Sequence, residues 1–296
     1  MYFSNKSYVF LNGEFIKASD ARITLFNQTL HYGNGVFEGI RAYGSPSGTT
    51  IFKAREHYKR LKESARKMHL KFDYSISELI DATYQLLKKN HLADAYIRPL
   101  LFSGVNMRLL PSEESNLFIG AWKWERYLGD KLVSVTISSY ERPNPHSCIV
   151  DAKVTGHYTT SILATYEARK KGFDEALLLD MHGHVAEAPG SNFFYEKNGV
   201  LYTPPPGHIL PGITRATVME IAKELGIPVK EELFTPEQLH DADSAFFTGT
   251  AAEVAGIKSI DNRRFRKKWE DTAGYILSQK YKEYIRTGDY SHSGII

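Results

Sequence analysis

Cysteine is almost absent from this chain, since Cys148 is the only one among 296 residues. A single cysteine excludes an intrachain disulfide framework and is typical of proteins in a reducing compartment. Long apolar runs are missing too: nowhere do about 18 apolar residues follow one another, so no membrane-spanning helix is expected. Residues 1–6 show no charged region leading into an apolar stretch, and we therefore expect a cytoplasmic protein.

An excess of charge of one sign is also lacking. The 37 Lys and Arg residues and the 34 Asp and Glu residues give a formal net charge of +3. One basic cluster, residues 263–268, lies between Asp261 and Glu270, and we interpret it as a solvated face rather than a nucleic-acid or membrane surface. Hydrophobic residues make up 42% of the chain, enough for a sizeable core in about two domains.

The first part of the chain combines strand and helix patterns. The pair Asn12-Gly13 tolerates the positive φ of a tight turn, apolar residues recur at helical spacing, and other segments are rich in β-branched and aromatic types, as strands are. The expected elements are a hairpin over residues 8–16, helices over 58–68 and 76–87, and strands over 95–102 and 117–122. We therefore expect a small α+β domain over residues 1–124.

The second part follows a polar stretch, residues 125–130, which is the predicted linker. Glycines at 172 and 226 can stop helices, and Thr235-Pro236 has the N-cap and first-turn proline of another helix start. The expected elements are strands over residues 132–138, 176–179, 192–196 and 200–202, and helices over 157–171 and 214–225. We expect a larger mixed α/β domain over residues 131–296.

Two residues far apart in the sequence carry the main chemical signal. Lys153 has an amine that can form a Schiff base with an aldehyde cofactor. Glu187 lies among small residues just before an apolar strand, and a carboxylate there can hold a pyridine nitrogen protonated. A lysine alone is far more often an exposed surface charge, but the two together suggest pyridoxal phosphate chemistry.

Other segments could bind a phosphate, although each alone is ordinary. In residues 210–215 a glycine turn precedes a helix start, where unpaired backbone N–H groups favour an anion. The small residues of 248–253 let backbone amides approach an anion closely. Arg55, near a helix start, has the guanidinium that pairs best with phosphate. The His-Gly-His stretch at 182–184 lies in a predicted turn with no acidic or thiol side chain expected nearby, so no metal site is expected.

Eight sequence blocks carry a family resemblance by their order along the chain. They are residues 31–33, 36–41, 55–57, 95–100, 153, 187–188, 210–215 and 249–253. In this order the chain resembles the fold-type IV pyridoxal phosphate enzymes, and among them the branched-chain amino acid aminotransferases. The resemblance extends from about Tyr8 to about Ile260.

The resemblance implies an α/β (α+β) fold of two parts, a small N-terminal α+β domain and a larger C-terminal mixed α/β pseudo-barrel domain, with pyridoxal 5′-phosphate as cofactor. Lys153 would be the Schiff-base lysine and the acid/base that moves the substrate's Cα proton. Glu187 would face the pyridine nitrogen, and Tyr158 would bond the ring oxygen. The other implied cofactor contacts, mostly to the phosphate, are Arg55, Leu210, Gly212, Ile213, Thr214, Gly249 and Thr250.

The same resemblance implies transamination between leucine, isoleucine or valine and 2-oxoglutarate, giving the branched 2-oxo acid and L-glutamate. Arg98 would receive the second carboxylate of glutamate or 2-oxoglutarate, and the expected assembly is at least a homodimer, with Tyr32 reaching into the neighbouring subunit's site. The substrate carboxylate would meet Thr250, Ala251 and Tyr96, and the apolar wall would consist of Phe37, Trp124 and Tyr127.

One stretch departs from the branched-chain pattern. Where those enzymes usually have a glycine-rich loop, residues 105–111 read Val-Asn-Met-Arg-Leu-Leu-Pro. We expect this loop at the mouth of the partner's pocket, where the bulky, charged Arg108 bears on the substrate range.

Three alternatives share much of this pattern. A D-amino acid or amine transaminase has the same lysine and glutamate, but Tyr96 and Arg98 argue against it. An aminodeoxychorismate lyase would release pyruvate without an amino acceptor. A non-enzymatic binding protein would have kept every cofactor position without using it, and a yellow colour of the purified protein would exclude this alternative.

Overall fold

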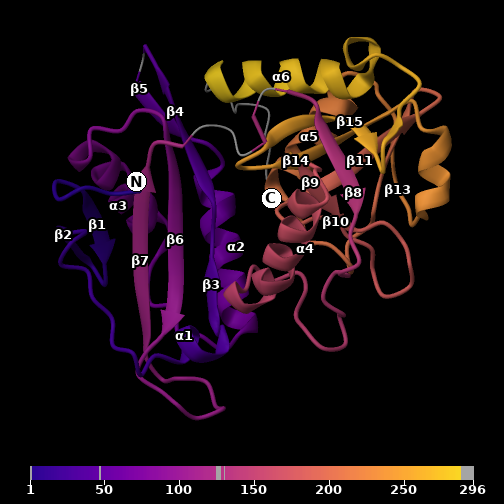
Figure 1. Ribbon diagram of the computed structural model, residues 1–296. Helices are drawn as coiled ribbons and strands as arrows, with labels where there is room; N and C mark the ends of the chain where they lie inside the picture. Colours follow the sequence, from indigo (N-terminus) through magenta and orange to yellow (C-terminus); the bar gives the residue numbers. More distant parts are fainter. Residues whose placement is uncertain (1, 47, 125–127, 130, 288–296) are drawn as a thin grey trace. The chain divides into compact units, whose positions relative to one another are not determined.

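The computed structural model describes residues 2–46, 48–124, 128–129 and 131–287 (Figure 1). Its contacts form two units: unit 1 is Met1–Glu125 with Ala152–Tyr158, and unit 2 is Arg126–Asp151 with Thr159–Ile296. Lys153 thus groups with the N-terminal elements, although it follows residue 131 in the sequence. The domain boundaries at residues 124 and 131 stay a prediction, and residues 125–127 and 130 of the predicted linker lie outside the described part.

Unit 1 is built on an antiparallel sheet. Its strands are β1 (Tyr8–Leu11), β2 (Glu14–Lys17), β3 (Gly35–Phe37), β4 (Ile40–Ser45), β5 (Gly48–Ile51), β6 (Ala95–Ser103) and β7 (Ser115–Trp122). Six of the seven strands follow the order β2-β1-β7-β6-β4-β5, and the seventh, β3, pairs with β6 off this path. Figure 1 shows the long β6 and β7 side by side, and the expected strand segments 95–102 and 117–122 lie within them.

Turn and cap residues set the ends of the elements in unit 1. The predicted hairpin is confirmed, because Asn12 (φ 50°) and Gly13 (φ 95°) form the turn between β1 and β2. Helix α3 (Ile76–Lys89) begins at a capping box in which Ser75 Oγ accepts from the Glu78 N–H at 3.2 Å and Glu78 Oε2 accepts from the Ser75 N–H at 2.7 Å. The other helices are α1 (Gln28–Tyr32) and α2 (Ala54–Lys67).

The core of unit 1 lies between this sheet and its two longer helices. Helix α2 packs on β3, helix α3 packs on β1 and β7, and the two helices contact each other. Tyr58, Leu61 and Ala65 recur at helical spacing and are fully buried, so one face of α2 is apolar. This packing fixes the position of the polar residues that share the same face.

Unit 2 is built on a mixed sheet. Its strands are β8 (Val133–Ile137), β9 (Glu175–Leu177), β10 (Glu187–Ala188), β11 (Ser191–Lys197), β12 (Val200–Thr203), β13 (Val229–Glu231), β14 (Ser244–Gly249), β15 (Glu253–Ile260) and β16 (Arg263–Arg264). The order is β13-β12-β11-β14-β15-β8-β9, with β10 paired to β11 and β16 to β15. Parallel pairs join β12 to β13 and β8 to both β15 and β9. This mixed α/β architecture confirms the predicted fold class.

The helices of unit 2 confirm two predictions and correct a third. Helix α4 (Tyr158–Lys170) is followed by Gly172 at φ 84°, and α5 (Ile213–Glu224) by Gly226 at φ 68°, both as expected. The segment after Thr235 has the predicted capping box, but Pro236–Asp241 is a short 3₁₀ helix rather than an α-helix. Helix α6 (Ala273–Thr287), which the sequence analysis did not single out, packs on β14 and β15.

Each unit has its own apolar core. Phe193 and Phe247 are fully buried in unit 2, where the two rings lie 5.9 Å apart edge to face. Within the described ranges, no helix is long and apolar enough to cross a membrane.

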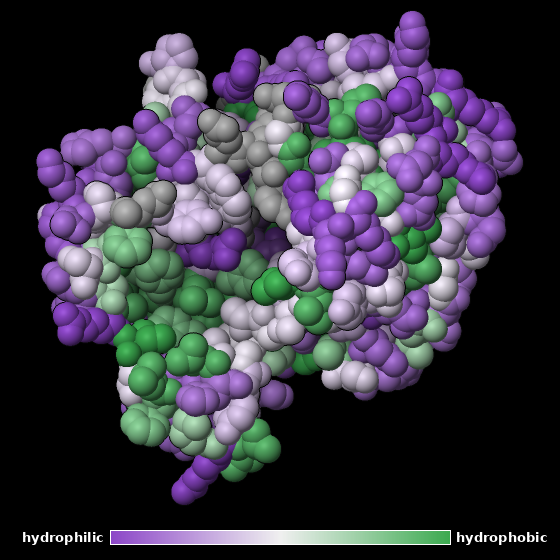
Figure 2. Space-filling model, in the orientation of Figure 1, coloured by the Kyte–Doolittle hydropathy of each residue, from purple (hydrophilic) through white to green (hydrophobic). Residues whose placement is uncertain are grey.

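A group of large apolar side chains stays exposed in unit 1. Figure 2 shows hydrophobic side chains gathered over part of this unit. The chain before and within α1 is tied to the loop after β6, because Asn106 N–H donates to Phe26 O at 3.2 Å and Gln28 Nε2 donates to both Arg108 O and Leu110 O at 2.7 Å. We call this group the α1 patch; its exposed members are Ile23, Leu25, Phe26, Leu30, Tyr32, Val105, Met107, Leu109 and Leu110.

Candidate active site

The main chain around Lys153 is held from two sides within unit 1. The Phe37 N–H donates to Lys153 O at 3.0 Å, and Val36 and Val154 form an isolated bridge. From the other side, the Lys153 N–H donates to Ser64 Oγ on α2 at 3.1 Å. The lysine backbone is therefore fixed by both a strand and a helix of unit 1.

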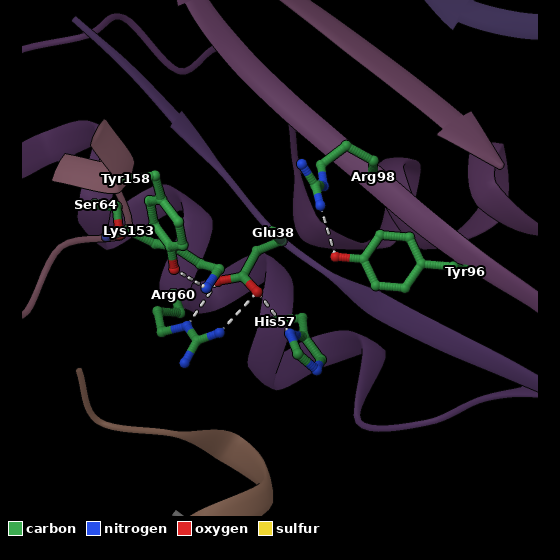
Figure 3. A network of polar contacts seen from close by, with 8 residues as sticks. All are labelled: Glu38, His57, Arg60, Ser64, Tyr96, Arg98, Lys153 and Tyr158. Atoms are coloured by element: carbon green, nitrogen blue, oxygen red, sulfur yellow. Dashed lines mark hydrogen bonds and ion pairs between the residues drawn. The ribbon is translucent and has the colours of Figure 1, made fainter. Parts of the chain in front are cut away.

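The Lys153 side chain is half-buried and points at a phenol (Figure 3). Its Nζ donates at 2.6 Å to Oη of Tyr158, the first residue of α4. The same amine lies 4.9 Å from the centre of the Phe37 ring, which packs edge to face on Tyr158 at 4.8 Å. The structure thus brings together three of the residues that sequence reasoning selected.

An aromatic and cationic group lies next to Phe37. The Arg98 guanidinium lies 4.6 Å from the centre of the Phe37 ring and donates to Tyr96 Oη at 2.8 Å. Tyr96 packs edge to face on Trp124 at 4.6 Å, and the Trp124 carbonyl accepts from Arg41 Nη2 at 2.9 Å. An apolar wall and a cation therefore occur together, as a site for both aliphatic and acidic substrates requires.

The arginine that lies near Lys153 is Arg60, whereas the sequence analysis chose Arg55. Arg55 is exposed at the start of α2. The Arg60 side chain is only 13% exposed and makes a fork with the fully buried Glu38, through Nε at 2.6 Å and Nη2 at 2.8 Å. Glu38 also accepts from His57 Nδ1 at 2.7 Å. The missed signal was helical spacing, since positions 57, 60 and 64 share one face of α2.

Burial and charge together set the ionisation of this buried group. Burial opposes the negative charge of Glu38, but the adjacent Arg60 and His57 outweigh it, and the pKa of Glu38 lies well below its usual value. Burial, assisted by Arg60 and Lys153, lowers the pKa of His57 despite the pull of Glu38. At neutral pH the group therefore holds an ionised Glu38 and a neutral His57.

In unit 2, Glu187 is 6% exposed and surrounded by donors. Asn192 Nδ2 donates to Oε2 at 2.9 Å, the Leu210 N–H lies 3.2 Å from Oε1, and Arg142 forms an ion pair with the same carboxylate. A guanidinium, an amide and a backbone N–H all stabilise the negative charge. The carboxylate suits a protonated ring nitrogen as partner, and sequence reasoning missed Arg142 and Asn192.

Two of the predicted phosphate segments lie close to Glu187 within unit 2. Asn192 Nδ2 also donates to Leu210 O at 2.9 Å, and a Cβ on Gly212 would lie 1.9 Å from Asn192 Oδ1. Gly212 is the N-cap of α5, so the amides of Ile213 and Thr214 belong to its first turn. A Cβ on Gly249 would lie 2.9 Å from Ser191 Oγ. These close approaches form a cradle of glycines and amides that fits a phosphate beside the carboxylate.

The remaining predicted residues divide into three groups. Thr250 and Ala251 are half-buried in the turn between β14 and β15, next to Gly249. Tyr32 is 49% exposed in the α1 patch, where its hydroxyl donates to Met107 O at 3.4 Å. Tyr127 lies outside the described residues.

The histidines at 182 and 184 lie beside an acidic residue, Asp180. Asp180 accepts from both of their backbone N–H groups, at 2.8 Å and 2.9 Å, and its Oδ2 lies 3.3 Å from His184 Nδ1. The expectation that these histidines lack acidic company was wrong. Among the described residues, no group of three or more His, Cys, Asp or Glu side chains could hold a metal ion.

Comparison with known proteins identifies a family that this chain resembles over most of its length. The family model "Amino-transferase class IV" matches residues 35–260. The branched-chain-amino-acid aminotransferase of Salmonella typhimurium is 40% identical over 262 residues, which cover 86% of this chain and 85% of the relative.

Solved structures extend the similarity to nearly the full length. The branched-chain aminotransferase of the archaeon Thermoproteus uzoniensis, solved with norvaline, has a TM-score of 0.93 at 36% identity and covers 97% of both chains. The branched-chain amino acid aminotransferase of Thermobaculum terrenum, solved in its PLP-form, has a TM-score of 0.90 at 30% identity and covers 97% of this chain and 96% of the other.

Proposed function

Because this chain belongs to the class IV aminotransferases, and within them to the branched-chain amino acid aminotransferases, we propose that it uses pyridoxal 5′-phosphate to move the amino group of leucine, isoleucine or valine to 2-oxoglutarate. The products are the branched 2-oxo acid and L-glutamate. The observation that carries this proposal is that the Lys153 amine is half-buried and donates a hydrogen bond to Tyr158 Oη at 2.6 Å.

Lys153 is the proton-transfer residue in this proposal. When bound, pyridoxal 5′-phosphate supplies an aldehyde that joins an amine covalently and a pyridine ring that accepts the electron pair left when Cα loses its proton. As a free amine, Lys153 Nζ would take the Cα proton as a general base. Tyr158 Oη accepts from Nζ and fixes its direction, and the Phe37 ring shields one side of the amine from water.

Two sets of residues bind the ends of the cofactor in this proposal. Glu187 keeps the ring nitrogen protonated, and its donors Asn192 and Leu210 N–H hold the carboxylate in one orientation. The phosphate meets the first-turn amides of α5, at Ile213 and Thr214, and the Thr250 hydroxyl. For the guanidinium that binds the phosphate, the burial and position of Arg60 favour it over the exposed Arg55.

The substrate is selected by residues around Phe37. Phe37 and Trp124 provide an apolar wall for a branched side chain, with Tyr127 assigned to it by the resemblance. Arg98 is close enough to the wall to receive the distal carboxylate of 2-oxoglutarate, since its guanidinium lies over Phe37 and bonds Tyr96. The resemblance assigns the carboxylate on Cα to Tyr96 and to the Thr250 and Ala251 amides.

The α1 patch supports assembly with a second copy of the chain. Nine large apolar side chains exposed together exceed what isolated surface positions explain, and such patches mark protein interfaces. Gln28 donates to two carbonyls of the loop 104–111, and this restraint reduces the entropy that the loop would lose when Met107 and Leu109 contact a second copy. We assign a homodimer to this surface and, from the single free Cys148, a cytoplasmic location.

A half-reaction assay tests the function directly. Protein loaded with pyridoxal phosphate is mixed with leucine, isoleucine, valine, glutamate, both alanine enantiomers or a simple amine, and loss of the yellow absorbance is followed. The proposal expects reaction with the three branched L-amino acids and L-glutamate, and an inactive Lys153→Ala variant. Reaction confined to D-alanine or the amine, pyruvate release without an acceptor, or near-normal turnover by Lys153→Ala would contradict it.

A further inference from the structure

Glu38 is a buried carboxylate that the proposed mechanism does not use. Its side chain is fully buried, and its two oxygens meet three donors: Arg60 Nε, Arg60 Nη2 and His57 Nδ1 (Figure 3). Such a charge is costly to bury, so its partners must be well placed. Glu38 adjoins Phe37, which bonds the Lys153 carbonyl. The carboxylate thus directly follows the strand that holds the lysine.

The geometry of the group is that of a clamp on one guanidinium. A bidentate fork fixes both the plane and the direction of the Arg60 guanidinium, which a single contact could not do. Arg60 lies one helical turn before Ser64, the residue that accepts from the Lys153 N–H. The clamp therefore fixes Arg60 relative to the same helix face that holds Lys153.

His57 completes the clamp as the third donor to the carboxylate. Because its ring is neutral and Glu38 is ionised, Nδ1 carries the proton and donates at 2.7 Å. Nε2 is buried and has no hydrogen-bond partner in the described part of the chain. His57 therefore contacts Glu38 through Nδ1 alone, and this hydrogen bond restricts rotation of the carboxylate about the Cγ–Cδ bond of Glu38.

We propose that Glu38 and His57 are positioning residues that hold the Arg60 guanidinium in the orientation in which it binds the phosphate of the cofactor. This inference rests on the proposed function, and it assigns no contact with substrate or cofactor to Glu38 or His57. A fixed donor loses less entropy on binding an anion than a mobile one, so the clamp raises phosphate affinity.

Electrostatics alone predicts the opposite sign for removal of Glu38. The carboxylate partly cancels the positive charge of Arg60, so Glu38→Gln would leave a stronger positive field and tighter phosphate binding if charge decided the outcome. If orientation decides it, the same substitution weakens phosphate binding. The direction of change in affinity therefore separates the two explanations.

The experiment compares two ligands that differ only in the phosphate. Apoprotein is titrated with pyridoxal 5′-phosphate and with pyridoxal, and the dissociation constants are read from absorbance and protein fluorescence. We expect Glu38→Gln to weaken pyridoxal 5′-phosphate by about tenfold or more, as loss of outer partners does at metal sites, and to leave pyridoxal within about twofold. In an Arg60→Gln background, the Glu38→Gln effect on the phosphate ligand should disappear.

The chain offers a matched control on the same helix. Glu63 forms the same kind of fork with Arg66, at 2.9 Å and 2.7 Å, but on the surface, with the two side chains 49% and 71% exposed. Glu63→Gln should change neither dissociation constant. If Glu38→Gln does not fold, His57→Asn keeps a donor beside the carboxylate and Glu38→Asp keeps the charge; each should weaken only the phosphate ligand, Glu38→Asp more strongly.

The outcomes are distinct. Tighter pyridoxal 5′-phosphate binding by Glu38→Gln, equal losses for both ligands, or an undiminished effect without Arg60 overturns the inference. Wild-type protein that binds no pyridoxal 5′-phosphate at all overturns the proposed function instead.

Discussion

Tyr158→Phe is the substitution that most directly tests the geometry at Lys153. It removes the hydroxyl that accepts from Nζ at 2.6 Å and keeps the ring that packs on Phe37 at 4.8 Å. Since the ring packing stays, any change in the free energy of unfolding comes from the lost hydrogen bond alone. The change isolates one hydrogen bond to the reacting amine.

The expected loss follows from the nature of that bond. A hydrogen bond to a charged group contributes about 1.5–3 kcal/mol, and about 1.4 kcal/mol corresponds to a tenfold change in rate. We therefore expect kcat/KM for leucine to fall about 10- to 150-fold. Single-turnover kinetics of the leucine half-reaction would measure this loss without interference from the second substrate.

The control is another tyrosine of the same helix. Tyr166 is 67% exposed on α4, and Tyr166→Phe should leave kcat/KM unchanged. If Tyr158→Phe reacted within about twofold of the wild type, the bond to Lys153 would contribute nothing to catalysis. The argument that Tyr158 directs the lysine would then be wrong.

Three further predictions concern other parts of the site. Arg98→Ala should weaken 2-oxoglutarate more than leucine, by about 1.5–3 kcal/mol; equal changes in KM for both would refute its assigned role. Gly212→Ala places a Cβ 1.9 Å from Asn192 Oδ1 and should lower pyridoxal phosphate affinity measured by titration, whereas Gly190→Ala, with open space around its Cβ, should not. Burial lowers the pKa of His57 from 6.5, so below pH 6.5 the unfolded chain binds a proton that the folded chain does not bind. The free energy of unfolding should therefore fall as the pH drops below 6.5. His57→Asn should make this fall smaller in denaturant titrations between about pH 7 and pH 5.

Local chemistry explains which parts of the fold the sequence predicted. The hairpin at Asn12-Gly13 and the capped helix α3 each depend on residues within a few positions, so their patterns are visible in the sequence. The segment after Thr235 has the right cap, but it is only six residues long and forms a 3₁₀ helix. A cap indicates where a helix begins, not how long it continues.

The site shows the same division between local and tertiary information. Lys153 and Glu187 were recognisable because an amine and a carboxylate suit the cofactor and because both residues fall in the family order of sequence blocks. Helical spacing places Arg60 on the same face of α2 as His57 and Ser64, but the burial of that face depends on the packing of α2 against the sheet, which the spacing alone does not give. Arg142 lies in a loop far from Glu187 in sequence, and only the fold brings this pair together.

The return of residues 152–158 to unit 1 has a practical consequence for protein engineering. A fragment ending at residue 124 would retain the tyrosine and arginine of β6 but would lose the amine that this unit carries. Expression of unit 1 alone would require residues 152–158 to be joined to the fragment so that they can pack beside β3 and Ser64. The reactive lysine therefore interrupts the sequence of unit 2 but belongs to the contacts of unit 1.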